Sequence, residues 1–63
     1  MEHKKQTIQR IQKLSEGIEQ EVVSRRVLNK YNNAELLGKT KGKNLVFQIN
    51  ESKIRVTPKG EIL

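Results

Sequence analysis

The sequence predicts an α+β fold in which an N-terminal amphipathic helix packs on a small, curled antiparallel β-meander of four to five strands. Three observations predict this class. Apolar residues repeat at helical spacing in the first third of the chain, they alternate with polar residues in the last third, and turn-forming residues separate the alternating segments. The 63 residues are expected to form a single domain with a thin hydrophobic core.

The predicted helix spans about residues 4–24. Gly17 interrupts this segment, and the sequence leaves open whether the helix continues through it or ends at residues 15–17. The apolar stripe stays in phase beyond the glycine, which favours one continuous helix. This stripe consists of Ile8, Ile11, Leu14, Ile18 and Val22.

The predicted meander occupies about residues 26–63, and its first hairpin turns at Asn32 and Asn33. Residues 26–31 then form an edge strand. This register places Arg26 opposite Lys39 on the outer face of the sheet.

Two further hairpins follow from the alternation of apolar residues. A turn at Lys41 and Gly42 places Leu36 opposite Phe47. A loop at residues 50–53 places Phe47 opposite Val56 in the next strand pair. Both hairpins therefore turn their apolar residues toward the same face.

The last turn is predicted at residues 57–60, where Pro58 suits the first central position and Gly60 supplies a positive φ. A three-residue loop with a glycine bulge returns Ile62 opposite Val56. The four turns together define one inner face, which the helix is expected to cover. That face consists of Val27, Tyr31, Ala34, Leu36, Leu45, Phe47, Ile49, Ile54, Val56 and Ile62.

A second apolar group falls on the opposite face of the predicted sheet, where Leu28, Leu37 and Val46 come together. Apolar residues on both faces of an antiparallel sheet are typical of a surface that is covered by another molecule. The sequence leaves two interpretations open: scattered surface aliphatics, or a self-association or partner surface.

The charge is distributed unevenly. Residues 1–23 carry four basic and four acidic side chains, whereas residues 24–63 carry nine basic and three acidic ones, so the net charge of +6 lies in the C-terminal part. Such an excess of positive charge is typical of a surface that contacts phosphates. The alternative is that the lysines only keep an exposed turn soluble. The predicted nucleic-acid contacts are Arg26, Lys39, Lys41, Lys43 and Arg55.

No combination of residues indicates catalysis, a cofactor or a metal site. His3 is the only histidine, and the chain contains neither cysteine nor aspartate. Glu51 and Lys53 have the spacing of half a nuclease site, but they fall in a predicted turn, and only Glu35 could supply the second carboxylate. We therefore expect a protein that is not an enzyme.

The absence of cysteine is compatible with a reducing compartment, and no segment has the length and apolarity of a signal peptide or membrane span. A cytoplasmic protein without membrane contact is expected. The sequence thus predicts a small basic binding module that contacts DNA or RNA phosphates without strong sequence specificity. The alternative is a protein-interaction or homo-oligomeric regulatory protein that uses the second sheet face or an edge strand.

Overall fold

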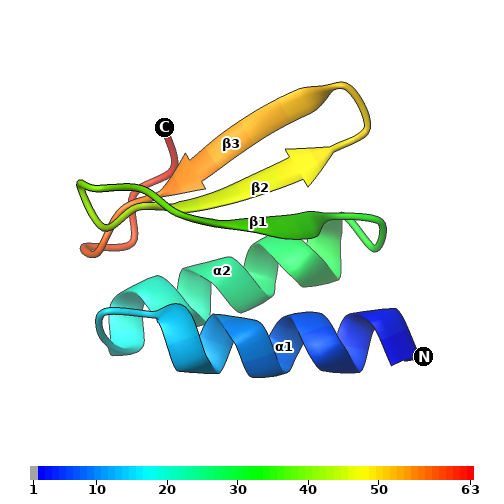
Figure 1. Ribbon diagram of the computed structural model, residues 1–63, viewed down its shortest axis with the longest axis horizontal. Helices are drawn as coiled ribbons and strands as arrows, with labels where there is room; N and C mark the ends of the chain where they lie inside the picture. Colours follow the sequence, from blue (N-terminus) through cyan, green and yellow to red (C-terminus); the bar gives the residue numbers. More distant parts are fainter. Residues whose placement is uncertain (1) are drawn as a thin grey trace.

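The computed structural model describes residues 2–63, with side chains from Lys4 onward. Its elements follow the order α1 (Glu2–Leu14), α2 (Ile18–Lys30), β1 (Glu35–Lys39), β2 (Leu45–Ile49) and β3 (Ser52–Val56). The two helices form one layer and the antiparallel sheet β1-β2-β3 forms the other (Figure 1). The α+β class is confirmed. The prediction of four to five strands is wrong, because the described residues form three.

The N-terminal segment contains two helices instead of the single helix predicted over residues 4–24. The break falls at residues 15–17, and Gly17 is the N-cap of α2 in an extended conformation with φ −173° and ψ −179°. The reversal of direction at this loop moves Ile18 and Val22 out of the buried stripe, and they are 78% and 41% exposed. Only the first part of the predicted stripe faces the core.

Residues 26–31 are not an edge strand, because α2 continues to Lys30. The buried face of α2 contains the polar residues Gln20 and Ser24 beside Val27 and Leu28. This mixed composition hides the helical period of the hydrophobic pattern. Asn32 and Asn33 do form a turn, but it connects α2 to β1.

The predicted pairing of Leu36 with Phe47 is confirmed, but a β-bulge follows it in β1. Gly38 pairs with Val46, so Leu37 is the additional residue of the bulge. The shift brings Lys39 opposite Leu45 on the inner face. Lys39 therefore points toward the helices and does not lie opposite Arg26 on the outer face.

The β2–β3 hairpin has a two-residue loop, Asn50 and Glu51, in place of the predicted loop at residues 50–53. Asn50 adopts φ 54°, a value that asparagine tolerates better than most residues. Phe47 therefore pairs with Ile54, and the predicted register is wrong by two residues. A shift of two leaves every side chain on its predicted face.

The last turn has the predicted form. Gly60 has φ 85°, and its N–H donates to the carbonyl of Thr57 at 2.9 Å. The turn brings Ile62 opposite Val56 in an isolated bridge, as predicted. Leu63 also exchanges main-chain hydrogen bonds with Arg55, so the C-terminal segment lies along the outer edge of β3.

The core lies between the helices and the inner face of the sheet, with Phe47 fully buried at its centre. Two residues predicted for this face, Tyr31 and Ile62, are instead exposed. Among the described residues, neither helix has the length and apolarity needed to cross a membrane. The buried apolar residues are Ile11, Val27, Leu28, Ala34, Leu36, Leu45, Phe47, Ile49 and Val56.

Candidate binding surfaces

The outer face of the sheet is one candidate surface. Both helices lie on the inner side, so neither covers it (Figure 1). Val46 and Gln48 are half-buried on β2, while Lys53 and Arg55 are exposed on β3. Because Arg55 pairs with Val46 and Lys53 with Gln48, this face combines a neutral central strand with a basic outer strand.

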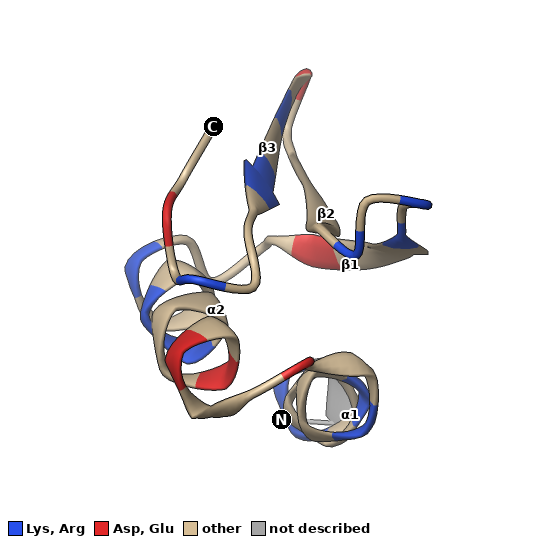
Figure 2. Cartoon of the chain, turned by 90° about the vertical axis from the view of Figure 1, so that its left-hand side faces the viewer, with Lys and Arg blue, Asp and Glu red and all other residues tan. Residues whose placement is uncertain are grey.

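The five predicted phosphate contacts do not form one continuous surface. Arg26 lies on α2 in the helix layer, and basic segments of α2 and of the β1–β2 turn lie on opposite sides of Figure 2. Arg55 and the turn lie closer together. Arg55 pairs with Val46, the second residue of β2, and the β1–β2 turn ends just before that strand.

The side chain of Lys39 makes a hydrogen bond and an ion pair within the molecule. Its Nζ atom donates to the carbonyl of Leu14 at 3.1 Å and forms an ion pair with Glu16 in the α1–α2 loop. The Nζ atom of Lys43 lies 3.9 Å from the same carboxylate. The hydrogen bond from Lys39, with the charges of Lys39 and Lys43, lowers the pKa of Glu16 against the opposing effect of burial. Lys39 thus anchors the loop to the sheet.

Gln20 of α2 binds the end of the β1–β2 turn from the helix side of the sheet. Its Nε2 group donates to the carbonyls of Lys43 and Val56, at 2.9 and 2.8 Å, and its Oε1 accepts the main-chain N–H of Glu16 at 2.7 Å. The side chain is fully buried. The turn that carries Lys41 and Lys43 is therefore fixed relative to α2, and sequence reasoning missed this residue.

Of the three residues predicted for the partner surface, only two lie on the outer face of the sheet. Leu28 is fully buried in α2, so its predicted position on the second sheet face is wrong. Leu37 and Val46 do lie together on the outer face, because the bulge places Leu37 beside the Gly38–Val46 pair. Leu37 is 48% exposed and Val46 is half-buried.

A groove of about 380 Å³ runs between α2 and the segment formed by β3 and the C-terminal residues. Its lining contains no acidic residue. At one end, the Nζ atom of Lys30 lies 5.5 Å from the centre of the Tyr31 ring. The lining residues are Val23, Arg26, Val27, Lys30, Tyr31, Ile54, Gly60 and Ile62.

The groove was missed because its residues from Arg26 to Tyr31 were interpreted as a strand. A signal was present in the sequence, since Val23, Val27 and Lys30 continue the helical spacing of three and four.

Within the part of the chain that the structure describes, no three His, Cys, Asp or Glu side chains gather where they could hold a metal ion. The side chain of His3 lies outside the described residues. No protein-family model matches the chain, and neither a curated protein nor a solved structure is significantly similar to it. The two surfaces must therefore be interpreted from their own chemistry.

Proposed function

We propose that this chain is a small non-enzymatic binding module that contacts nucleic-acid phosphates through the outer sheet face and the β1–β2 turn. The observation that carries the proposal is the position of Arg55 on the exposed face of β3, close along the sheet to the turn with Lys41 and Lys43. Lysine and arginine side chains gathered on a fixed surface can contact the phosphates of a nucleic-acid backbone.

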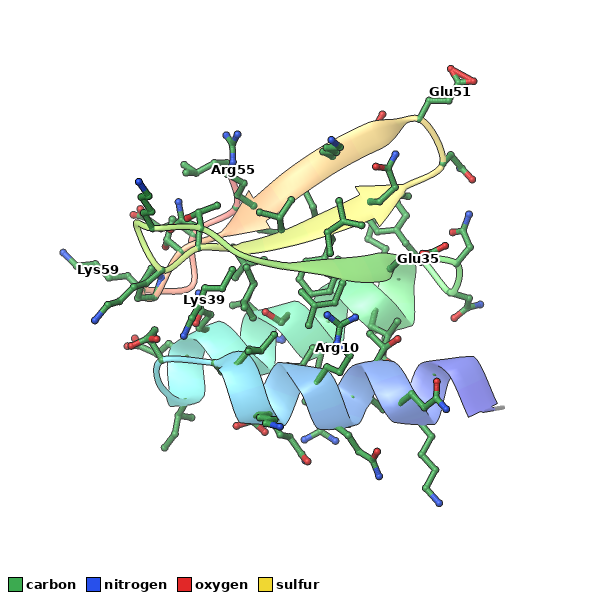
Figure 3. The ribbon with its side chains drawn as sticks, in the orientation of Figure 1. Arg10, Glu35, Lys39, Glu51, Arg55 and Lys59 are labelled. Carbon is green, nitrogen blue, oxygen red and sulfur yellow. The ribbon has the colours of Figure 1, made fainter. Side chains whose placement is uncertain are left out.

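The distribution of acidic residues supports the same surface. Glu35 and Glu51 lie toward the far end of the sheet, away from Arg55 and Lys59 (Figure 3). Glu16, an acidic residue against the turn, is paired with Lys39 and also lies 3.9 Å from the Nζ atom of Lys43. The turn and the adjoining end of β3 carry Lys41, Lys43, Arg55 and Lys59 against Glu16 and Glu61, so their net charge is positive and attracts polyanions.

The binding is expected to be largely independent of sequence. The chain has two aromatic residues, of which Phe47 is buried and Tyr31 lines the groove on the helix side. Neither provides a platform on which exposed bases of a single strand stack. Phosphate contacts from lysine and arginine position a protein without reading bases.

The test is a triple variant, Lys41→Gln, Lys43→Gln and Arg55→Gln, titrated with random-sequence duplex and single-stranded DNA and RNA over a range of salt. Loss of three phosphate contacts should reduce the slope of log affinity against log salt by about two to three units for duplex DNA. The matched control is Lys4→Gln, Lys5→Gln and Lys13→Gln, which removes the same charge from α1. An equal loss in both variants, or no wild-type binding at about 50 mM salt, would refute the proposal.

A second candidate is protein interaction through the same face, and the exposure of Leu37 next to Val46 favours it. One substitution is expected to affect nucleic-acid binding and protein association in opposite directions. Leu37→Lys adds a cation beside the basic strand, so it should strengthen nucleic-acid binding. In a protein interface the same lysine would bury an unpaired charge and weaken association. Measuring both properties on this variant assigns the face.

A further inference from the structure

The exposed side of α2 is divided into two halves of different character. Its N-terminal half presents Ile18, Glu19 and Val22, all exposed. Its C-terminal half presents Arg26 and Lys30, also exposed. The residues at positions 18, 22, 26 and 30 are spaced by four, so each neighbours the next, and together they form one ridge that turns by about 120° around the helix.

The basic half borders the groove. Arg26 and Lys30 stand on its α2 side, and Val23, Val27 and Ile54 provide apolar lining between them and the sheet. An occupant that fits this site has branched apolar side chains with an acidic group beside them. The N-terminal half of α2 has this composition.

We infer that two copies of this chain associate through antiparallel α2 helices, related by a two-fold axis near the middle of the helix. In this arrangement Ile18 lies level with the partner's Lys30, and Val22 lies level with the partner's Arg26. Glu19 of each copy faces the basic rim of the other. Each contact occurs twice, which is the self-complementarity that a two-fold interface requires.

Three physical features favour this occupant. The association removes Ile18 and Val22 from water and fills an apolar groove of about 380 Å³. It pairs the acidic start of each helix with the basic end of the other, and the antiparallel helix dipoles are also complementary. It supplements the thin core of a 63-residue chain.

This interface is distinct from the outer sheet face. Since α2 covers the inner side of the sheet, the association leaves both outer faces exposed (Figure 1). Dimerisation and phosphate binding can therefore be tested separately, and one proposal can be wrong while the other is right.

The test is a charge exchange measured by sedimentation equilibrium on the full chain. Glu19→Lys produces two repulsive contacts in its own homodimer, as does the double variant Arg26→Glu with Lys30→Glu. Each variant alone is expected to dimerise at least about tenfold more weakly than the wild type. An equimolar mixture restores every pair, because the lysine at position 19 meets glutamates while Glu19 of the other chain meets Arg26 and Lys30.

Two controls make the result specific. Glu51→Lys changes the net charge as Glu19→Lys does, but in the distant β2–β3 turn, and Leu37→Glu alters the outer sheet face. Both are expected to dimerise like the wild type, and circular dichroism establishes that each variant is folded. A wild-type chain that stays monomeric at high micromolar concentration, a mixture that fails to associate, or equal weakening by the controls would overturn the inference.

Discussion

Gln20 donates a hydrogen bond from its Nε2 group to the carbonyl of Val56 at 2.8 Å, which joins the first turn of α2 to the end of β3. The same group reaches the carbonyl of Lys43, and Oε1 accepts from Glu16. One buried amide thus satisfies three main-chain groups from three segments. Buried polar groups contribute to a unique structure when all their partners are present, as they are here.

Gln20→Leu is expected to lower the free energy of unfolding by about 2 to 4 kcal/mol, because the carbonyls of Lys43 and Val56 lose their donor, the second of them in a buried hydrogen bond, and the N–H of Glu16 loses its acceptor. Gln12→Leu, on the exposed side of α1, is the matched control and should change stability little. Chemical denaturation followed by circular dichroism measures both. Equal midpoints for the Gln20 variant and the wild type would contradict the role assigned to this side chain.

The ion pair of Glu16 with Lys39 predicts a pH dependence. The folded state holds the pKa of Glu16 below its ordinary value of 4.5, so this group stabilises the fold above pH 4.5. The contribution is lost as the pH falls through that value toward the lower pKa of the folded state. Glu16→Gln should therefore be less stable than the wild type at neutral pH, and the difference should shrink below pH 4.5.

Thermal unfolding of the wild type and of Glu16→Gln across this pH range measures the effect. Glu51→Gln removes the same charge from an exposed turn and controls for net charge. A difference between wild type and Glu16→Gln that stays constant from neutral pH to acid would mean that the ion pair does not contribute.

Gly60 and Gly42 form a matched pair of glycines in two turns. Gly60 has φ 85°, and an added Cβ would lie 3.1 Å from Cγ2 of Val23 and 3.3 Å from the carbonyl oxygen of Glu19. Gly60→Ala should cost about 1 to 2 kcal/mol for the backbone conformation, with a further penalty for this contact. Gly42 has no such φ, and its nearest atoms are 3.8 Å or more away, so Gly42→Ala should be neutral or slightly stabilising. Similar melting temperatures for the two variants would contradict the argument.

Ser24 gives a prediction of the opposite sign. Its hydroxyl is buried in α2 and has no hydrogen-bond partner among the described residues. Ser24→Ala removes the uncompensated polar atom and raises helix propensity, so stability should rise by about 0.5 to 1 kcal/mol. Ser15→Ala is the control, since Oγ of Ser15 donates to the carbonyl of Ile11 at 2.5 Å. A Ser24→Ala protein less stable than the wild type would indicate a partner for the hydroxyl.

The C-terminal half was largely predictable because its turns have distinctive residues and its strands alternate regularly. Pro58 and Gly60 fixed the last turn, and the bridge from Val56 to Ile62 followed from it. The hairpin of β2 and β3 was placed on the correct face despite its shifted register, since the side-chain period of a strand tolerates a shift of two.

The second helix was not predictable from hydrophobicity because its buried side uses Gln20 and Ser24 while its exposed side carries Ile18 and Val22. In α2 the positions of the apolar residues thus do not coincide with the positions that are buried. The β1 bulge, which turned Lys39 inward, did have a signal, since a glycine inside a strand, here Gly38, often marks a bulge. The candidate site inherited both errors: the missed helix had placed Arg26 and Leu28 in the sheet, and the missed bulge had placed Lys39 on the outer face.

The sheet has hydrogen-bonding partners along parts of both its edges. Nη1 of Arg10 donates to the carbonyl of Leu36 in β1 at 2.6 Å, while Leu63 pairs with Arg55 along β3. Unpaired strand edges are the templates on which proteins grow fibrils. With these main-chain groups already bonded and lysines on both hairpins, concentrated samples of this chain are expected to form closed, finite assemblies instead of fibrous aggregates.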